Sequence, residues 1–356
     1  MEFIEHRPLT LLDRIVECIR HDFPALLVGG PGLGKSDRVR QAAGALGMEH
    51  MDVRLQLYDP VDVKGLPFIQ NVQDQIAQQV RWAMPDFVAR SQGDKNVVLC
   101  YEEINCATAS TMNTALQFIL DKRVGEHVLG PNVRQIACVN RAEHRAHVNP
   151  MSAPLINRFL VLDVQPNLDE WMKWAMKSGI HEAVIGYLNY RPEALYQEPK
   201  KVQDEFSNFP SPRSWARVSR LIERGMADFT YLRGCIGEGA AVELSTYLKD
   251  RNDMPDIDKL LKGEVGWDPV KEKTKLSVVY AVTAALGDRV IRDPRQVEPA
   301  ARVLLKIQPE IASLFLSMLM NSSVKNVMRL ITGSRGLTAW LKKHQKLISR
   351  AIAVAT

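Results

Sequence analysis

The chain of 356 residues is 46% hydrophobic and 24% charged, close to the average of globular proteins, and its length corresponds to two or three domains. Its net charge of +5 is mild, so composition alone does not indicate a nucleic-acid partner. The most apolar stretches are too short to cross a bilayer, and the first residues do not resemble a signal peptide. We therefore expect a cytoplasmic protein without a membrane partner.

Five cysteines are scattered through the chain, and none belongs to a CxxC pair. Their odd number and their spacing argue against a disulfide framework or a zinc site, and they fit a reducing compartment. Cys100 and Cys138 stand inside apolar runs, so we expect both to be small buried side chains.

The first half of the chain alternates apolar runs with amphipathic segments. The apolar runs predict buried strands at residues 25–28, 51–57, 97–101, 135–139 and 159–164. Helices are predicted at residues 11–21, 35–46 and 107–120, the first of them capped by Thr10 and Asp13. Residues 58–91 are interrupted by prolines and read as an insertion of short elements. Strands that alternate with helices predict a parallel sheet with crossover connections.

The second half changes character after Pro166, because no convincing strand follows. Helices are predicted near residues 168–177, 181–190, 212–224, 238–249, 273–286, 297–307 and 309–319. A polar stretch over 250–262 contains Pro255 and marks a plausible domain boundary.

The strongest motif is the glycine-rich segment Gly29–Ser36, which fits the pattern GxxxxGK[ST] between a predicted strand and a predicted helix. Glycines allow successive backbone N–H groups to point at one phosphate, and the helix adds its positive end. We expect Lys35 to reach the β- and γ-phosphates and Ser36 to bind Mg²⁺. The predicted nucleotide-binding residues are Gly30, Pro31, Gly32, Leu33, Gly34, Lys35, Ser36 and Asp37.

An acidic pair, Glu102 and Glu103, directly follows the strand predicted at 97–101. A carboxylate that ends a strand beside the phosphate loop can hold Mg²⁺, and the next can polarise the attacking water. We therefore assign Glu102 to the metal and Glu103 to the water. The usual pattern has Asp at the first position, so slow hydrolysis stays open, as does a plain acidic pair on the surface.

These residues resemble the AAA+ superfamily and, within it, the MoxR-like ATPases. The similarity is carried by Val98–Asn105, by Ser110–Leu120 and by Asp59–Pro67, and it covers about residues 5–250. The resemblance implies an α/β P-loop AAA+ domain with a central parallel five-stranded sheet, followed by an all-α lid and an extra α-helical C-terminal region. The implied domains are residues 1–165, 166–252 and 253–356.

The resemblance also implies roles for three further residues. Asn140 matches the sensor-1 position, Arg158 the arginine finger and Arg213 the sensor-2 position. The alternatives are a polar strand end for Asn140, an ion pair within the subunit for Arg158 and a solvated first-turn residue for Arg213. Either Arg141 or Arg145 is a candidate for a second arginine that acts on the neighbouring subunit.

By the same resemblance, the expected activity is ATP hydrolysis with Mg²⁺ in a homo-oligomeric ring, in this family a hexamer. ATP hydrolysis would drive the remodelling or activation of a protein partner. Such partners often contain a von Willebrand factor A domain. Phe68 and Trp82 are candidates for gripping a substrate, or they simply pack the insertion. A nucleic-acid motor is a less favoured alternative, supported only by the basic residues between Lys342 and Arg350. A nucleotide-gated scaffold with slow hydrolysis is another.

Overall fold

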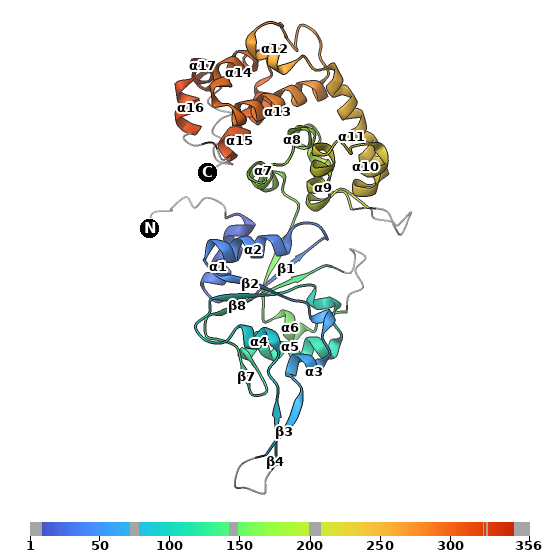
Figure 1. Cartoon of the computed structure of the whole chain (residues 1–356), viewed down its shortest axis with the longest axis vertical. Coiled ribbons are helices and arrows are strands. Elements are labelled where there is room, and N and C mark those ends of the chain that lie inside the picture. The colour runs from blue at the N-terminus through green and yellow to red at the C-terminus, as the bar shows by residue number, and fades with distance from the viewer. Residues whose placement is uncertain are drawn as a thin grey trace. The chain divides into compact units, whose positions relative to one another are not determined.

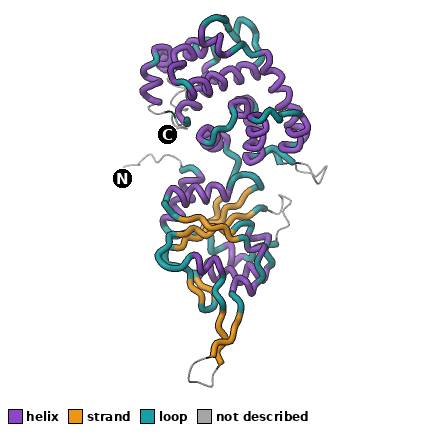
Figure 2. The backbone as a smooth tube through the Cα atoms, viewed as in Figure 1, coloured by secondary structure: helices purple, strands orange, loops and turns teal. Residues whose placement is uncertain are grey.

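A computed structural model of the chain describes residues 9–71, 78–141, 149–198, 208–322, 324 and 327–344. It divides into two units, Met1–Gln165 and Pro166–Thr356. Figure 2 shows that the strands of the described residues all lie in the first unit, whereas the second unit is helical.

The first unit is built on a sheet of five strands in the order β2-β5-β8-β1-β9. All neighbouring pairs are parallel, which confirms the predicted fold class. The strands are β1 Ala25–Gly29, β2 Glu49–Val53, β5 Val97–Tyr101, β8 Val133–Val139 and β9 Leu160–Val164. Strand β5 is buried along its whole length, because a central parallel strand is covered on both faces.

Helices cover both faces of this sheet (Figure 1). They are α1 Leu11–Arg20, α2 Lys35–Ala45, α3 Pro60–Lys64, α4 Asp86–Arg90, α5 Ala109–Asp121 and α6 Ala153–Ile156, with single 3₁₀ turns η1 Leu55–Leu57 and η2 Ile104–Cys106. The largest apolar cluster of the unit joins the sheet to α3, α4 and α5. Helices α1 and α2 lie on the opposite face, and the predicted capping box of Thr10 and Asp13 begins α1.

The predicted strand over 51–57 is wrong at its second half. Pairing of β2 with β5 ends at Val53 opposite Tyr101, and the chain then turns into η1. Leu55 packs into the core while Leu57 is exposed, so the apolar alternation that suggested a strand continues through a 3₁₀ turn.

Two antiparallel hairpins were not predicted. Strands β3 Pro67–Asn71 and β4 Gln78–Trp82 form the first, which projects from the unit in Figure 1, and β6 Arg123–Val124 and β7 His127–Val128 form the second. Gly65 lies at the base of the first hairpin with φ 99°, and a Cβ there would stand 1.9 Å from the Ala83 carbonyl oxygen. Only glycine fits this close approach.

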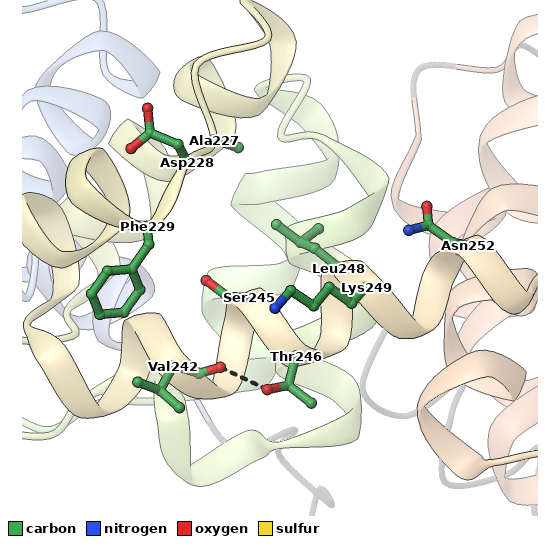
Figure 3. Close-up of a pocket in the computed structure, with 9 residues that line it drawn as sticks. All are labelled: Ala227, Asp228, Phe229, Val242, Ser245, Thr246, Leu248, Lys249 and Asn252. Carbon is green, nitrogen blue, oxygen red and sulfur yellow. Dashed lines mark hydrogen bonds between the residues drawn. The ribbon is translucent and has the colours of Figure 1, made fainter.

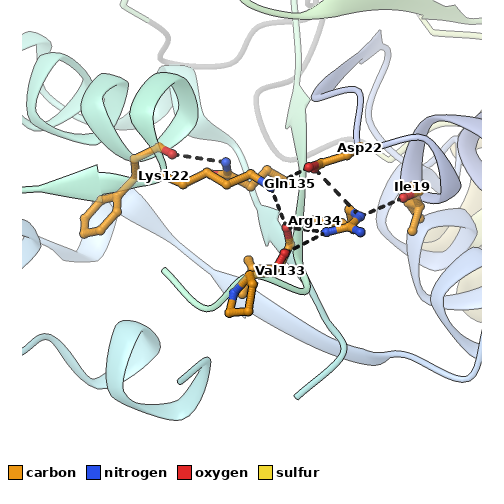
Figure 4. Close-up of polar contacts among 8 residues, drawn as sticks. Ile19, Asp22, Lys122, Val133, Arg134 and Gln135 are labelled. Carbon is orange, nitrogen blue, oxygen red and sulfur yellow. Dashed lines mark hydrogen bonds and ion pairs between the residues drawn. The ribbon is translucent and has the colours of Figure 1, made fainter. Parts of the chain in front are cut away.

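A polar cluster ties the end of α1 to the sheet (Figure 4). The Lys122 Nζ lies 2.6 Å from a carboxylate oxygen of Asp22 and also donates to the Val133 carbonyl at 3.2 Å. Arg134 donates to the Ile19 carbonyl at 3.2 Å. The cluster therefore joins α1, the end of α5 and the start of β8.

The second unit contains α-helices that mostly match the predicted ones. They are α7 Leu168–Lys177, α8 Glu182–Tyr190, α9 Pro212–Glu223, α10 Phe229–Ile236, α11 Glu238–Asp250, α12 Ile257–Lys262, α13 Leu276–Arg292, α14 Val297–Leu304, α15 Pro309–Asn321, α16 Val327–Gly333 and α17 Arg335–Lys343, with 3₁₀ turns η4 Pro192–Leu195, η5 Arg251–Asp253 and η6 Pro294–Gln296. Helices α10, α12, α16 and α17 were not predicted. In α10, Phe229 and Tyr231 face outward and blur its apolar pattern. Helix α12 lies in the stretch over 250–262 that was expected to be a polar boundary, and its Leu260 and Leu261 are in an apolar cluster. Within the described residues, no helix is long and apolar enough to cross a membrane.

Two apolar clusters fill the second unit, one around Trp215 and one around Phe315. Helix α13 packs into both, with Ala281 and Ala284 in the first and Val282 and Leu286 in the second. Residues 166–356 form one unit that shares this helix. The expected boundary at residue 252 between a lid domain and a C-terminal domain therefore stays a prediction.

Candidate nucleotide-binding site

Three neighbouring parallel strands end at the same edge of the sheet. Strand β8 lies between β1 and β5. The phosphate loop follows β1, Asn140 follows β8, and the acidic pair follows β5. Because the strands are parallel, their carboxyl ends meet there, which is the edge where ligands bind in open α/β sheets.

The phosphate loop has the backbone that its sequence predicts. Gly32 and Gly34 have φ values of 78° and 77°, in the left-handed region that glycine adopts without strain. Helix α2 begins at Lys35, directly after the loop. Arg38 donates to the Leu33 carbonyl at 2.6 Å and so ties the loop to the first turn of the helix.

Lys35 is buried and bonded to main-chain and side-chain acceptors. Its Nζ donates to the carbonyl oxygens of Gly29 and Gly30, both at 2.9 Å, and to Oδ1 of Asn140 at 2.8 Å. A buried ammonium is costly unless it is bonded in this way. These contacts hold the charge inside the loop, where a phosphate would meet it.

Asn140 connects the loop to the acidic pair. While its Oδ1 accepts from Lys35, its Nδ2 lies 3.4 Å from Oε1 of Glu103, a long hydrogen bond. Its main-chain carbonyl accepts from Nδ2 of Asn105 at 2.7 Å. Lys35, Asn140 and Glu103 therefore form one hydrogen-bonded chain across three strand ends.

Glu103 has an unusual backbone conformation, with φ 49° and ψ 44°. Residues other than glycine, asparagine and aspartate rarely adopt this left-handed region, and such conformations gather at functional sites. The turn directs Glu103 toward Asn140, whereas Glu102 accepts a hydrogen bond from the Cys100 thiol at 3.2 Å. The two carboxylates of the pair thus have different surroundings.

The predicted Mg²⁺ ligands, Ser36 and Glu102, offer a hydroxyl and a carboxylate oxygen, and both side chains are partly exposed. Mg²⁺ prefers oxygen ligands and keeps several waters, so this donor set fits the ion. Asp37, predicted to contact nucleotide, is exposed and pairs with Arg40 at 3.0 Å.

Arg158 lies away from the phosphate loop of its own chain. It stands two residues before β9, and Leu160 pairs with Ala25 at the start of β1, whereas the phosphate loop follows the end of β1. The five-residue strand spans about 16 Å, more than an arginine side chain can reach. Arg158 is exposed, and among the described residues no carboxylate forms an ion pair with it.

The remaining predicted arginines are placed differently. Arg213 is exposed in the first turn of α9, in the second unit, so its role stays a prediction. Arg141 pairs with Asp163 at 2.6 Å within its own chain, and Arg145 falls outside the described residues.

The two candidate gripping residues of the insertion also differ. The Lys64 Nζ lies 4.0 Å from the ring centre of Trp82, which is partly buried against the base of the hairpin. Phe68 is exposed on the hairpin, as are Ile69 and Val80, which pair across its strands. Packing therefore accounts for Trp82 but not for Phe68.

A separate hollow of about 470 Å³ lies in the second unit, beside the start of α10 and along α11 (Figure 3). Its lining residues are Ala227, Asp228, Phe229, Val242, Ser245, Thr246, Leu248, Lys249 and Asn252. Asp228 already caps α10, and Thr246 bonds within α11. We assign no chemistry to this hollow.

Three features of the site were not predicted. They are the hydrogen bond of Arg38 to the loop, the hydrogen bond of Asn105 to the Asn140 carbonyl and the left-handed backbone of Glu103. Asn105 stood inside the segment that resembles the MoxR-like family, which was a usable signal. The other two depend on local geometry that no residue pattern specifies.

No family model matches the chain, and no curated protein matches it. Solved structures of Thermotoga maritima RuvB mutants align with it. One has 14% identity and a TM-score of 0.38, covering 78% of this chain and 80% of that chain. Two others have 13% identity with TM-scores of 0.38 and 0.39, covering 75% and 76% of this chain and 81% and 82% of theirs. The assignment of the site therefore rests on the residues of this chain.

Proposed function

We propose that the chain is an AAA+ ATPase that hydrolyses ATP at the site formed by the phosphate loop, Asn140 and the acidic pair. The observation that carries this proposal is the hydrogen-bonded chain from Lys35 through Asn140 to Glu103. It joins a phosphate-binding cation to a candidate for activating water, which is the combination that phosphoryl transfer to water requires. The preference for ATP over GTP comes from the family resemblance.

Each residue has a distinct task in this proposal. The loop amides and Lys35 bind the phosphates, and Ser36 with Glu102 would hold Mg²⁺, which neutralises charge on the phosphate oxygens. Glu103 polarises the attacking water, and Asn140 orients that water and Glu103 together. Asn105 fixes the position of Asn140 through its carbonyl.

We further propose a homo-oligomeric ring, a hexamer by family resemblance, in which Arg158 completes the site of the neighbouring subunit. Its position beyond reach of its own loop and its lack of an ion-pair partner among the described residues support action on a neighbour. Ile156, Leu160 and Val161 lie near it in the sequence and are exposed apolar side chains, which suit subunit contact. Heterologous contacts close into rings when the rotation between neighbouring subunits allows it. Arg213 is proposed as the sensor-2 arginine.

We propose that the ring remodels a protein partner, as MoxR-like proteins do. The resemblance leads us to expect that this partner contains a von Willebrand factor A domain. The hairpin β3–β4 supports a protein over a nucleic acid, because Phe68, Ile69 and Val80 expose apolar side chains on it. Protein surfaces that bind nucleic acid are instead rich in lysine and arginine.

ATP binding and turnover by purified protein test the assignment of the site. Lys35→Ala removes a buried charge that bonds phosphate, so we expect ATP affinity to fall by about 10- to 100-fold and turnover to vanish. The matched control is Lys95→Ala, an exposed lysine of the same unit that donates only to the Arg90 carbonyl. Equal ATP affinity in the two variants would remove the basis of the proposal.

A further inference from the structure

A second group of potential ligands lies beneath the phosphate-loop helix, outside the residues that would contact nucleotide. Cys100 of β5 and Cys138 of β8 are both buried, and their sulfur atoms are 3.9 Å apart. Glu102 approaches the Cys100 sulfur at 3.2 Å. The spacing of 38 residues between the cysteines hid this arrangement, which arises because β5 and β8 are neighbours in the sheet.

The neighbouring strand β2 adds two more potential ligands next to the same sulfur. Asp52 pairs with Cys100 in the register of β2 and β5, and His50 precedes it on the same face. The ligand atoms of His50, Asp52 and Cys100 lie within 4.8 Å of one another, as do those of Cys100, Glu102 and Cys138. Cys100 is therefore the centre of both groups.

His50 has a buried nitrogen that lacks a partner. Its side chain is only 10% exposed, and its Nε2 has no hydrogen bond among the described residues. The nearest carboxylate oxygen of Asp52 is 3.5 Å away and does not meet hydrogen-bond geometry. The ligand atoms of His50 group with those of Asp52 and Cys100 but not with those of Cys138 or Glu102, so this histidine stands beside the second group rather than in it.

The distances match those of a thiolate-bound cation. Two sulfur ligands at about 2.3 Å from a tetrahedral Zn²⁺ are about 3.8 Å apart, close to the 3.9 Å observed. We propose that Cys100, Cys138 and Glu102 form a binding site for a thiophilic divalent cation of the Zn²⁺ class.

Binding would release the two thiol protons to solvent and requires no oxidation. A bound dication favours the thiolate form of each cysteine. Glu102 is partly exposed, whereas the two cysteines are buried.

This site has a consequence that rests on the proposed function. Glu102 is the carboxylate assigned to Mg²⁺, so a thiophilic cation that binds Glu102 would compete with Mg²⁺ for that ligand. Zn²⁺ would then inhibit ATP turnover at concentrations that saturate the cysteine site. Metal binding itself is measured without nucleotide, so failure of the ATPase assignment does not affect that measurement.

The test is titration of the full-length protein with Co²⁺ under reducing conditions, while the absorption of thiolate-to-cobalt charge transfer is recorded. We expect one Co²⁺ per chain with charge transfer from two thiolates. Cys138→Ala should leave about half of that intensity and weaken binding by at least about tenfold, and Glu102→Gln should also weaken it. The matched control is Cys18→Ala, a buried cysteine in α1, which should bind as the wild type does.

Thermal unfolding of each variant establishes that it is folded, and Glu102→Gln keeps the test decisive if a cysteine variant does not fold. Absence of charge transfer in the folded wild-type protein would overturn the proposal, leaving a hydrogen-bonded thiol pair. Binding that is unchanged in folded Cys138→Ala, or unchanged in Glu102→Gln, would overturn the ligand set.

Discussion

Lys35 and Asn140 are 105 residues apart in the sequence, yet the Nζ of one lies 2.8 Å from Oδ1 of the other. The contact exists because β8 is inserted between β1 and β5, so the end of β8 stands between the phosphate loop and the acidic pair. The bond directs the amide nitrogen of Asn140 toward Glu103. One asparagine thereby couples the group that binds phosphate to the group proposed to activate water.

Asn140→Ala should separate binding from turnover. The substitution removes a neutral partner of Lys35 but keeps the bonds of Lys35 to Gly29 and Gly30, so ATP affinity should change by only about threefold. Turnover should fall by about 100-fold or more, because a group that orients the reacting water is lost. The control is Asn132→Ala, a partly exposed asparagine that donates to the Asp94 carbonyl. Similar turnover in both variants would mean that Asn140 has no role in hydrolysis.

Glu103→Gly should stabilise the protein while it stops hydrolysis. Glycine adopts φ 49° without the cost that a side chain imposes, so the melting temperature should rise, reflecting about 1 kcal/mol of relieved strain. The carboxylate proposed to polarise water is lost at the same time. Lys273→Gly is the control, since Lys273 has φ 51° in the second unit and should gain stability without losing turnover. A lower melting temperature for Glu103→Gly would show that this backbone is not strained.

Mixed rings test whether Arg158 acts on the neighbour. Arg158→Ala and Lys35→Ala subunits should each be inactive alone. In random mixtures, an Arg158→Ala subunit keeps its phosphate loop and can receive Arg158 from a Lys35→Ala neighbour, so about a quarter of the sites should be complete. Steady-state turnover of the mixture measures this recovery. Turnover that stays at zero in rings shown to contain both variants would argue against Arg158.

The second unit should lose stability at acid pH through Glu182. Burial alone would raise the pKa of Glu182, but the contacts with His181 and Arg251 outweigh it and lower that pKa to about 2. The Arg251 guanidinium donates to the carboxylate at 2.6 Å. Because the folded pKa lies below the unfolded value, this stabilisation is complete above about pH 4.5 and is lost as the pH falls toward 2.

The expected loss is roughly 3 kcal/mol over that interval. Glu182→Gln should therefore unfold more readily at neutral pH and show a weaker dependence of melting temperature on pH between 4.5 and 2. Glu264→Gln, at an exposed position of the same unit, should keep the wild-type dependence. Parallel acid-unfolding curves for Glu182→Gln and wild type would contradict the assignment.

The parts of the fold that follow from local chemistry were predictable. Glycines and Lys35 in sequence specified the phosphate loop, and the run Val97–Tyr101 specified a strand that the structure has at the same residues. The pairing of Cys100 with Cys138 was not predictable, because it depends on the order of strands rather than on their sequences. The hairpin β3–β4 was missed for a different reason, since its outward apolar residues have no core to give them a pattern.

The comparison of wild-type protein with Glu103→Gln is the most direct test of the central claim, that this site hydrolyses ATP through Glu103. ATP binding and phosphate release would be measured on the same preparations. We expect both proteins to bind ATP with Mg²⁺ at similar affinity, and only the wild type to release phosphate. If both proteins release phosphate at the same rate, or neither releases any while both bind ATP, the claim is contradicted and a nucleotide-gated scaffold becomes the better account.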